Sequence, residues 1–559
     1  MDKKWLKSYP AGIPAEIDAG EFRCIGDLFE RSVAAFGSRV AFISMGRPAS
    51  YAQMGRLARD FAACCQSMGL TKGARIALML PNVLQYPVCL FGALRAGLTV
   101  VNCNPLYTPR ELAHQLSDSG AEAIVVLESF AHVVQAAIGG TSVRHVLVTR
   151  LGDMLGPIRG AVVDFVVRHV KKKVPAWRLP QSVAWRAAMA RGAAASPAPV
   201  DVGPDDIAFL QYTGGTTGVA KGAMLTHRNV VANLQQAHAW IRPFLREGEE
   251  IVITALPLCH IFALTANCLT FFRIGAANVL IANPRDIPAF VGELARHRFT
   301  AITGVSTLYG ALLNHPDFAG LDFSRLRIAL GGGMAVQRAV AERWQKVTGV
   351  PLIEAYGLTE ASPAVAINPL DLTEFNGAIG LPIPSTEVAI RDDEGRDLPP
   401  GEPGELCVRG PQVMKGYWRR PEETAQVMMP DGFLRTGDVA VMDEKGFLRI
   451  VDRRKDMILV SGFNVYPNEV ESVAMMHPGV LEAAAVGAPD PRTGEAVRLY
   501  VVRRDAALTA GMLIAHCREN LAPYKVPHRV VFCDELPKSG IGKVLRRALR
   551  DAAPPSPAG

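Results

Sequence analysis

The sequence lacks the cysteine patterns that mark zinc ribbons or small disulfide frameworks. Its ten cysteines are scattered over 559 residues, and although Cys64 and Cys65 are adjacent, no pair has the C-x-x-C spacing. No charge of one sign dominates: 60 Lys and Arg against 53 Asp and Glu give a net charge of +7, with no basic stripe interleaved with aromatics. We therefore expect no nucleic-acid partner, and a reducing, cytoplasmic environment with structural thiols.

Signals for export or membrane insertion are also weak. The first residues are basic, but no apolar segment follows them, so no signal peptide is expected. Residues 251–272 carry no formal charge and are long enough to cross a bilayer. However, Pro257 and the polar His260 interrupt the run, and a strand-like start gives way to a helical pattern at residues 263–271. A buried strand, a turn and a core helix are the better interpretation.

What the chain does contain is length and regular alternation. With 559 residues, 49% of them apolar and 20% charged, it is globular in composition and too long for one core. Over about the first 370 residues, strand-like runs alternate with helical patterns, which predicts parallel sheets covered by helices on both faces. Short strands broken by glycine and proline follow from about residue 377, and a new unit mixing strands and helices begins after residue 452.

The densest local signal is a loop rich in glycine and threonine at residues 212–222, directly after the apolar run 207–210. Glycines let backbone N–H groups converge on an anion, threonine hydroxyls add donors, and Lys221 adds charge. This pattern is typical of a phosphate cradle, with an ordinary polar loop as the alternative. A Walker A loop is excluded, because Ala220 and not glycine precedes Lys221.

Further short motifs follow in order along the chain. They are Gly-Gly-Gly-Met at residues 331–334, Glu-Ala-Tyr-Gly-Leu-Thr-Glu at 354–360, Arg-Thr-Gly-Asp at 435–438, Asp-Arg-Arg-Lys-Asp at 452–456 and Pro-Lys-Ser-Gly-Ile-Gly-Lys at 537–543. With the loop at 212–222, they resemble the motifs of the adenylate-forming enzymes: acyl-CoA synthetases, luciferases and the adenylation domains of peptide synthetases. Residues 104–111 and 431–455 are most similar to bacterial long-chain fatty-acid–CoA ligases.

The resemblance implies an α/β fold in two domains. A large N-terminal domain would contain two parallel α/β subdomains and a small β-rich subdomain, and a small, mobile α+β lid domain would follow. We expect the N-terminal domain, which binds AMP and the acyl group, at residues 1–452, the lid at residues 453–550 and a flexible tail at residues 551–559. A homodimer is compatible with the sequence, which does not decide the oligomeric state.

The resemblance also implies an activity. A long-chain fatty acid would react with ATP, with Mg²⁺ as cofactor, to give acyl-AMP, and coenzyme A would then yield acyl-CoA, AMP and pyrophosphate. Adenylation replaces a carboxylate, a poor electrophile, by a mixed anhydride with a good leaving group. Three alternatives stay open: a fatty acyl-AMP ligase without coenzyme A use, a medium-chain acyl-CoA synthetase, and a non-catalytic lipid-binding protein. Intact Glu360, Asp438 and Lys543 disfavour the last of these.

The motifs imply an ATP site. Contacts to the β- and γ-phosphates are implied for Thr213, Gly214, Gly215, Thr216, Thr217, Gly218 and Lys221. Further ATP contacts, to adenine and ribose among them, are implied for Gly331, Gly332, Gly333, Glu354, Ala355, Tyr356, Asp438, Ile450 and Arg453. Thr359 would contact the α-phosphate and Glu360 would hold Mg²⁺, since one carboxylate beside phosphates and water suits that ion.

Lys543 is the catalytic residue that the resemblance implies first. Its ammonium group would bridge the fatty carboxylate and the α-phosphate and screen their charge as the transition state forms. The two arginines that follow, Arg546 and Arg547, are interpreted as a solvated helix face.

Lys455 resembles the hinge of the family, about which the lid turns between the two half-reactions. After that turn, Gly462 and Phe463 would lie beside the pantetheine arm of coenzyme A.

The apolar stretch after Pro257 is where we expect the fatty chain to bind, because a long run without charge suits an alkyl tunnel. The residues implied for this acyl pocket are His260, Ile261, Phe262 and Leu264. A buried structural role is the alternative for His260. The sequence departs from the family at Cys259, Ala335 and Ala355, where tyrosine, proline and glycine are usual, so the preferred chain length is not predicted.

Residues 159–178 combine a helical apolar pattern with dense positive charge. Val162, Phe165, Val166 and Val170 fall near helical spacing, residues 171–173 are all lysine, and Trp177 follows shortly after. A basic amphipathic helix with an interfacial tryptophan, here Trp177, can lie on an anionic bilayer, each lysine contributing about 1 kcal/mol near the surface. We expect reversible binding to the inner face of the cytoplasmic membrane, with an ordinary surface helix over the core as the alternative.

Overall fold

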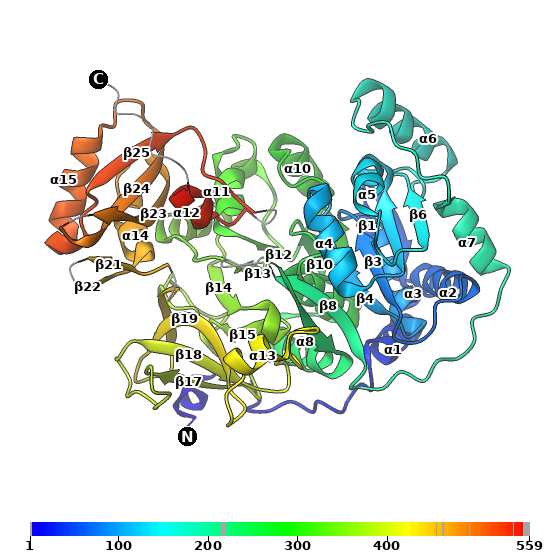
Figure 1. Ribbon diagram of the computed structural model, residues 1–559, viewed down its shortest axis with the longest axis horizontal. Helices are drawn as coiled ribbons and strands as arrows, with labels where there is room; N and C mark the ends of the chain where they lie inside the picture. The colour runs from blue at the N-terminus through cyan, green and yellow to red at the C-terminus, as the bar shows by residue number, and fades with distance from the viewer. Residues whose placement is uncertain are drawn as a thin grey trace.

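Four β-sheets organise the part of the chain that the structure describes (Figure 1). The structure is a computed structural model that describes residues 3–213, 220–453, 456–460, 463–490, 492–539 and 542–551, with the backbone only of Arg453 and Asn464. The expected flexible tail therefore lies, apart from Asp551, outside the described residues.

The first sheet has seven strands in the order β7-β6-β5-β3-β4-β8-β9, and every pair is parallel except β8 with β9. Its strands are β3 (Arg75–Met79), β4 (Thr99–Asn102), β5 (Ala123–Leu127), β6 (His145–Thr149), β7 (Ser182–Ala184), β8 (Ile207–Thr213) and β9 (Lys221–Thr226). The helices along this part of the chain are α1 (Ile25–Phe36), α2 (Tyr51–Ser67), α3 (Gln85–Arg95), α4 (Pro109–Ser119), α5 (Ala131–Ala137), α6 (Pro157–Phe165) and α7 (Trp185–Ala193).

The second sheet has nine strands in the order β16-β15-β14-β13-β12-β10-β11-β1-β2, parallel in its centre and antiparallel at both edges. Its strands are β1 (Val40–Ser44), β2 (Arg47–Ser50), β10 (Ile251–Thr254), β11 (Ala277–Leu280), β12 (Ala301–Gly304), β13 (Ile328–Gly331), β14 (Leu352–Gly357), β15 (Ala364–Ile367) and β16 (Leu381–Pro382). The helices here are α8 (His227–Ile241), η5 (Ala263–Leu269), α9 (Thr270–Arg273), α10 (Ile287–Leu294), α11 (Ser306–Asn314) and α12 (Arg338–Thr348).

Two smaller sheets complete the fold. An antiparallel sheet, yellow in Figure 1, holds β17 (Glu387–Arg391), β18 (Gly404–Arg409), β19 (Leu434–Met442) and β20 (Leu448–Arg453), with α13 (Pro421–Val427) nearby in the chain. The C-terminal unit, orange to red, holds β21 (Ile458–Val460), β22 (Phe463–Val465), β23 (Val480–Asp490), β24 (Gly494–Arg503) and β25 (Arg529–Cys533), with α14 (Pro467–Met475), α15 (Ala510–Asn520) and α16 (Arg546–Asp551).

This architecture confirms the predicted fold class: two largely parallel α/β sheets, a small antiparallel sheet and a separate α+β unit. Local signals explain where several helices begin. Ser50 and Thr108 each cap a helix by accepting from the backbone N–H three residues on, where Gln53 and Glu111 return the bond.

Residues 251–272 form strand β10, a turn, the π-helix η5 and the short helix α9, as interpreted from the sequence. In the described part of the chain, no helix has both the length and the apolar character needed to cross a membrane.

The basic segment at residues 159–178 is shorter as a helix than its pattern predicts. Helix α6 continues as a π-helix over Val166–Val170 and ends at the lysines. Trp177 is half-buried and packs against the core of the seven-stranded sheet, so the expectation of an interfacial tryptophan is wrong. Four large apolar side chains on α6 and the π-helix remain exposed: Ile158 (82%), Val162 (58%), Phe165 (60%) and Val170 (64%).

Candidate active site

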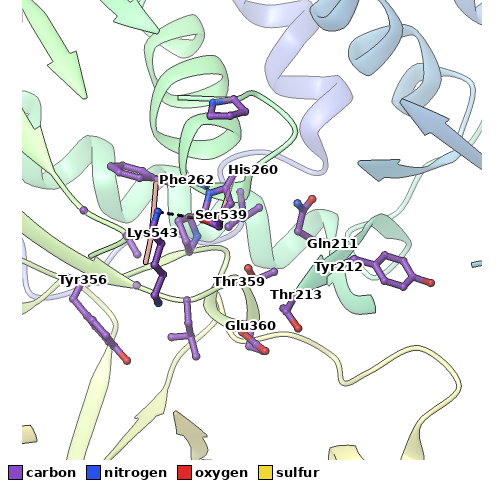
Figure 2. Close-up of a pocket in the computed structure, with 18 of the residues that line it drawn as sticks. Gln211, Tyr212, Thr213, His260, Phe262, Tyr356, Thr359, Glu360, Ser539 and Lys543 are labelled. Atoms are coloured by element: carbon purple, nitrogen blue, oxygen red, sulfur yellow. Dashed lines mark hydrogen bonds between the residues drawn. The ribbon is translucent and has the colours of Figure 1, made fainter. Parts of the chain in front are cut away.

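A cavity of about 1300 Å³ lies where the large sheets, the β-rich subdomain and the C-terminal unit meet. Its lining brings together many residues that the sequence motifs single out (Figure 2). These are Thr213, Lys221, His260, Ile261, Phe262, Gly332, Gly333, Ala355, Tyr356, Thr359, Glu360, Asp438 and Lys543.

Other predicted residues lie elsewhere. Gly331, Glu354, Leu264 and Ile450 do not line the cavity. Phe463 is exposed on the C-terminal unit, where its ring stacks on Tyr524 with centroids 4.9 Å apart. Outside the described residues fall Gly214, Gly215, Thr216, Thr217, Gly218, Lys455 and Gly462, and for Arg453 the backbone alone is described, paired with Asp438.

The phosphate-loop end of the cavity is framed by two paired strands. Thr213 ends β8 and lies opposite Lys221, which begins β9. The Lys221 ammonium nitrogen lies 5.3 Å from the centre of the Tyr417 ring. The Tyr417 hydroxyl donates to Glu360 Oε1 at 2.7 Å. One lysine and one carboxylate thus contact the same tyrosine side chain.

The glycine-rich end of β13 forms a second wall, and the close packing there requires residues without side chains. A Cβ on Gly331 would lie 2.5 Å from Val336 Cγ2, and one on Gly332 would lie 3.0 Å from the Phe262 ring. Gly333 has φ +76°, a backbone conformation that favours glycine. A flat ring could approach this backbone closely.

Tyr356 and Asp438 line the cavity from two different sheets. Tyr356 lies on β14, Asp438 lies on β19, and the Tyr356 hydroxyl donates to Asp438 Oδ2 at 2.5 Å. Asp438 is buried, and its backbone N–H donates to the Thr436 hydroxyl at 3.1 Å. A carboxylate placed in this way can accept hydrogen bonds from vicinal hydroxyl groups.

Glu354 lies behind the glycine wall. Its carboxyl is buried and accepts a hydrogen bond from the Val336 N–H at 3.1 Å. Burial raises the pKa of Glu354 to about 8, so the group is mostly protonated at neutral pH. Since it does not line the cavity, the structure gives it a packing position rather than a direct contact.

The segment that carries His260 is fixed by a buried polar network that sequence reasoning missed. Asn82 donates from Nδ2 to the carbonyls of Thr254 and Leu256, each at 2.9 Å, and accepts from the Leu258 N–H at 2.8 Å. Gln211 donates to the Cys259 carbonyl at 2.7 Å.

Tyr86 and Asn102 extend this network. The Tyr86 hydroxyl donates to Asn102 Oδ1 and contacts the Leu258 carbonyl, both at 2.7 Å, and Asn102 Nδ2 donates to Gln211 Oε1 at 3.0 Å. A signal existed in the sequence: Asn82 and Asn102 come at the carboxyl ends of apolar strands, where parallel sheets gather functional groups.

His260 itself is half-buried at the start of the apolar part of the cavity. Its Nδ1 accepts from the Phe262 N–H at 3.3 Å, so the neutral ring carries its proton on Nε2. Burial lowers the pKa of His260 to about 4, and the positive charge of Lys543 contributes in the same direction. The imidazole is therefore neutral near pH 7.

The Lys543 loop reaches this point from the C-terminal unit. The Ser539 N–H donates to the Lys543 carbonyl at 2.7 Å, and the Lys543 N–H donates to the Ser539 hydroxyl at 3.2 Å. Gly542 has φ +85°, and a Cβ there would lie 3.0 Å from the Thr307 hydroxyl of α11. Figure 2 shows Lys543 between Phe262 and Tyr356, across the cavity from Thr213.

The arginines after Lys543 differ from the sequence interpretation. Arg547 is solvated as expected, with a side chain 63% exposed, but the Arg546 side chain is 17% exposed. Arg546 donates to Glu471 and lies 3.8 Å from Asp452 and 3.5 Å from Asp456. Burial alone would lower the pKa of Arg546. The charges of these carboxylates have the larger combined effect, and they raise its pKa. The interpretation of a solvated face was wrong for Arg546, because its acidic partners are far away in sequence.

Known proteins share both the sequence and this fold. Residues 29–418 match the family described as AMP-binding enzyme, and residues 469–543 match the AMP-binding enzyme C-terminal domain. A long-chain-fatty-acid–CoA ligase of Escherichia coli is 57% identical over 554 residues, 99% of each chain. A protein of the same name from Bacillus subtilis is 38% identical, over 98% of this chain and 97% of its own.

Solved structures agree. A benzoate CoA ligase from Burkholderia xenovorans has a TM-score of 0.79 at 28% identity, covering 94% of this chain and 100% of its own. ATP-bound MatB from Rhodopseudomonas palustris has a TM-score of 0.79 at 29% identity, covering 94% and 98%. The resemblance to adenylate-forming enzymes is confirmed, and this chain belongs to the AMP-binding enzyme family.

Proposed function

We propose that this protein is a long-chain fatty-acid–CoA ligase, which converts a fatty acid, ATP and coenzyme A to acyl-CoA, AMP and pyrophosphate. The observation that carries this proposal is the single cavity that joins the Lys221 and Glu360 end, the Tyr356 and Asp438 end and the apolar segment after His260. The identity to long-chain-fatty-acid–CoA ligases over nearly the full chain favours this activity over an acyl-AMP ligase without coenzyme A use.

The residues present fit a magnesium ion as cofactor. Tyr417 bonds to Oε1 of Glu360, and the described residues include no cluster of three or more His, Cys, Asp or Glu that could cage a metal. One carboxylate oxygen beside nucleotide phosphates matches the preference of Mg²⁺ for few protein ligands and retained water. In this proposal Glu360 holds the ion, which neutralises phosphate charge when bound, and Thr359 contacts the α-phosphate.

For adenylation, the chain supplies binding and charge. Lys221 and the loop before it hold the β- and γ-phosphates, while Asp438 accepts from the ribose hydroxyls. Lys543 lines the same cavity as His260, and in this proposal its ammonium group lies where an acyl carboxylate and an α-phosphate would meet. Neutralising two anions that approach each other stabilises the transition state more than the separated substrates.

For thioester formation, we propose that the C-terminal unit turns about Lys455, withdraws Lys543 and brings Gly462 and Phe463 to the coenzyme A site. The exposed Phe463 ring supports this idea, because an apolar ring at the surface is available to a ligand that arrives later. The proposed units are residues 1–452, residues 453–550 and a tail at residues 551–559.

A direct assay tests the proposal. Purified protein is incubated with ATP, Mg²⁺ and palmitate, with and without coenzyme A, and the products are separated by mass. We expect the thioester with coenzyme A and the adenylate without it. Adenylate under both conditions would indicate an acyl-AMP ligase, and neither product would reject both activities.

We also propose reversible binding to the inner face of the cytoplasmic membrane. Support comes from the exposed Ile158, Val162, Phe165 and Val170 beside the exposed lysines at residues 171–173, on an element that projects from the blue lobe in Figure 1. A homodimer stays a separate hypothesis, which light scattering at several protein concentrations would test.

Replacing Lys171, Lys172 and Lys173 with glutamate should weaken sedimentation with anionic vesicles, because each lysine contributes about 1 kcal/mol near such a surface. Binding of the unaltered protein should fall as salt rises. Glutamate at the exposed Lys346 of α12 is the matched control. Sedimentation that is absent at low salt, or equal in the triple variant, would remove this segment as the anchor.

A further inference from the structure

A short strap crosses the edge of the phosphate-loop strands. We define the strap as residues 416–420, which precede α13. The Met224 N–H donates to the Gly416 carbonyl at 2.9 Å, and the Trp418 N–H donates to the Gly222 carbonyl at 2.8 Å. Between these bonds, Tyr417 pairs with Ala223 in an antiparallel bridge. The strap is therefore aligned residue by residue with strand β9, which begins at Lys221.

One end of the strap is anchored by Asp118, whose side chain is mostly buried. Its carboxylate accepts from the Tyr212 hydroxyl at 2.6 Å and from Arg420 Nη2 at 2.8 Å, and its carbonyl accepts from Trp418 Nε1 at 3.1 Å. Asp118 thus joins β8 to both Trp418 and Arg420. These contacts fix the strap against strand β8.

Tyr417 faces the cavity and is half-buried. Its ring lies under the Lys221 ammonium group, and its hydroxyl donates to Glu360 Oε1. The Glu360 backbone is held just before the strap, because the Met414 N–H donates to the Glu360 carbonyl at 2.7 Å. Lys221 begins strand β9 and Glu360 lies in a short 3-10 helix after β14, yet one tyrosine side chain contacts both.

We propose that Tyr417 is a positioning residue that couples the phosphate-binding lysine to the cation-binding carboxylate. By donating to Oε1, its hydroxyl fixes the Glu360 rotamer before ligands arrive and leaves Oε2 to bind the cation. Its ring attracts the ammonium group and restrains the long Lys221 side chain. This inference rests on the roles proposed above for Glu360 and Lys221.

The test separates positioning from simple packing. Tyr417→Phe keeps the ring and removes the hydroxyl, and ATP binding is measured by titration calorimetry at a series of Mg²⁺ concentrations. We expect the Mg²⁺ concentration for half-maximal enhancement of ATP binding to rise about tenfold, since a hydrogen bond to a charged group is lost. ATP binding without Mg²⁺ should stay unchanged. Tyr417→Leu, which also removes the ring, should weaken ATP binding in both conditions.

Tyr9→Phe is the matched control. Tyr9 also donates a half-buried hydroxyl bond, to the Pro382 carbonyl at 2.5 Å, but it does not line the cavity. Its Mg²⁺ dependence should match that of the unaltered protein. If Tyr417→Phe melts at a lower temperature while its Mg²⁺ dependence is unchanged, its role is packing and the inference is overturned. Because binding is the readout, the result stands apart from whether the unaltered protein forms acyl-CoA.

Discussion

Two segments meet in the cavity and are held in opposite ways. The segment before His260 is bonded to side chains from other elements: Asn82 makes three hydrogen bonds to it and Gln211 makes one. The loop of Lys543 is closed by hydrogen bonds to its own Ser539 and approaches the large domain through Gly542. The first segment is therefore fixed by side chains of the surrounding core. The second is stabilised by hydrogen bonds within its own turn.

This difference teaches which parts can move. Withdrawing the Lys543 loop leaves its internal turn intact, while moving the His260 segment would leave several buried polar groups without partners. In the proposed reaction, a residue on the first segment should matter in both half-reactions, and one on the second should matter in a single half-reaction.

Lys543→Ala should give the largest effect and the sharpest contrast. We expect adenylate formation to fall by about 10³-fold or more, because a preorganised charge is lost where two anions meet. Thioester formation from pre-made acyl-AMP should stay close to the original rate in a single-turnover assay. Lys543→Arg, which keeps the charge, should recover part of the loss. If both half-reactions lost activity equally, Lys543 would not act in adenylation alone.

Lys455→Pro tests the proposed rotation of the C-terminal unit. Proline fixes φ and should prevent the rotation proposed at this position. We expect adenylation to continue while transfer to coenzyme A falls by about 10²-fold or more, since the second arrangement is no longer reached. Pyrophosphate release and thioester yield report the two steps separately. Lys455→Ala is the control, and a normal thioester yield in the proline variant would place the hinge elsewhere.

Asn82→Ala should weaken the segment that carries His260. Two carbonyls and one N–H lose their buried partner, which we expect to cost about 3 kcal/mol of unfolding free energy and to slow both half-reactions. Urea unfolding followed by tryptophan fluorescence is suitable, because all six tryptophans precede residue 452. Asn283→Ala, at an exposed turn residue, should change the free energy by less than about 0.5 kcal/mol. If Asn82→Ala left stability unchanged and slowed only one half-reaction, the His260 segment would not be fixed in the way described.

A smaller effect concerns pH. The folded pKa of His260, about 4, lies below the usual value near 6.5, so the unfolded chain binds more protons between these values. Stability should therefore fall as pH drops from about 6.5 toward 4, by up to about 1.4 kcal/mol per pH unit for this group. His227, with a pKa of about 4, acts in the same direction. His260→Gln should flatten the dependence measured by urea unfolding, and an unchanged slope would show that His260 is not buried as a neutral base.

The features that short motifs determine could be predicted from the sequence. The features that depend on contacts between distant residues could not. The alternation of strands and helices predicted both large sheets, and the motif residues Lys221, Tyr356, Asp438 and Lys543 lie in one cavity. The polar network around Asn82 depends on partners more than 170 residues away, and the burial of Arg546 depends on three acids at least 75 residues away. Nothing local marks such pairings, because the tertiary fold brings the partners together.

A buried hydrogen bond joins residues on the two sides of the proposed hinge at Lys455. The Asn468 N–H at the start of α14 donates to Asp452 Oδ2 at 2.9 Å, and Asp452 is fully buried. If the C-terminal unit pivots at Lys455, Asp452 stays with the large domain and this bond must open in each catalytic cycle. A hydrogen bond to a charged group is worth about 1.5–3 kcal/mol, so it would act as a latch that favours the arrangement described here. The interval between the two half-reactions would then depend on how often that latch is released.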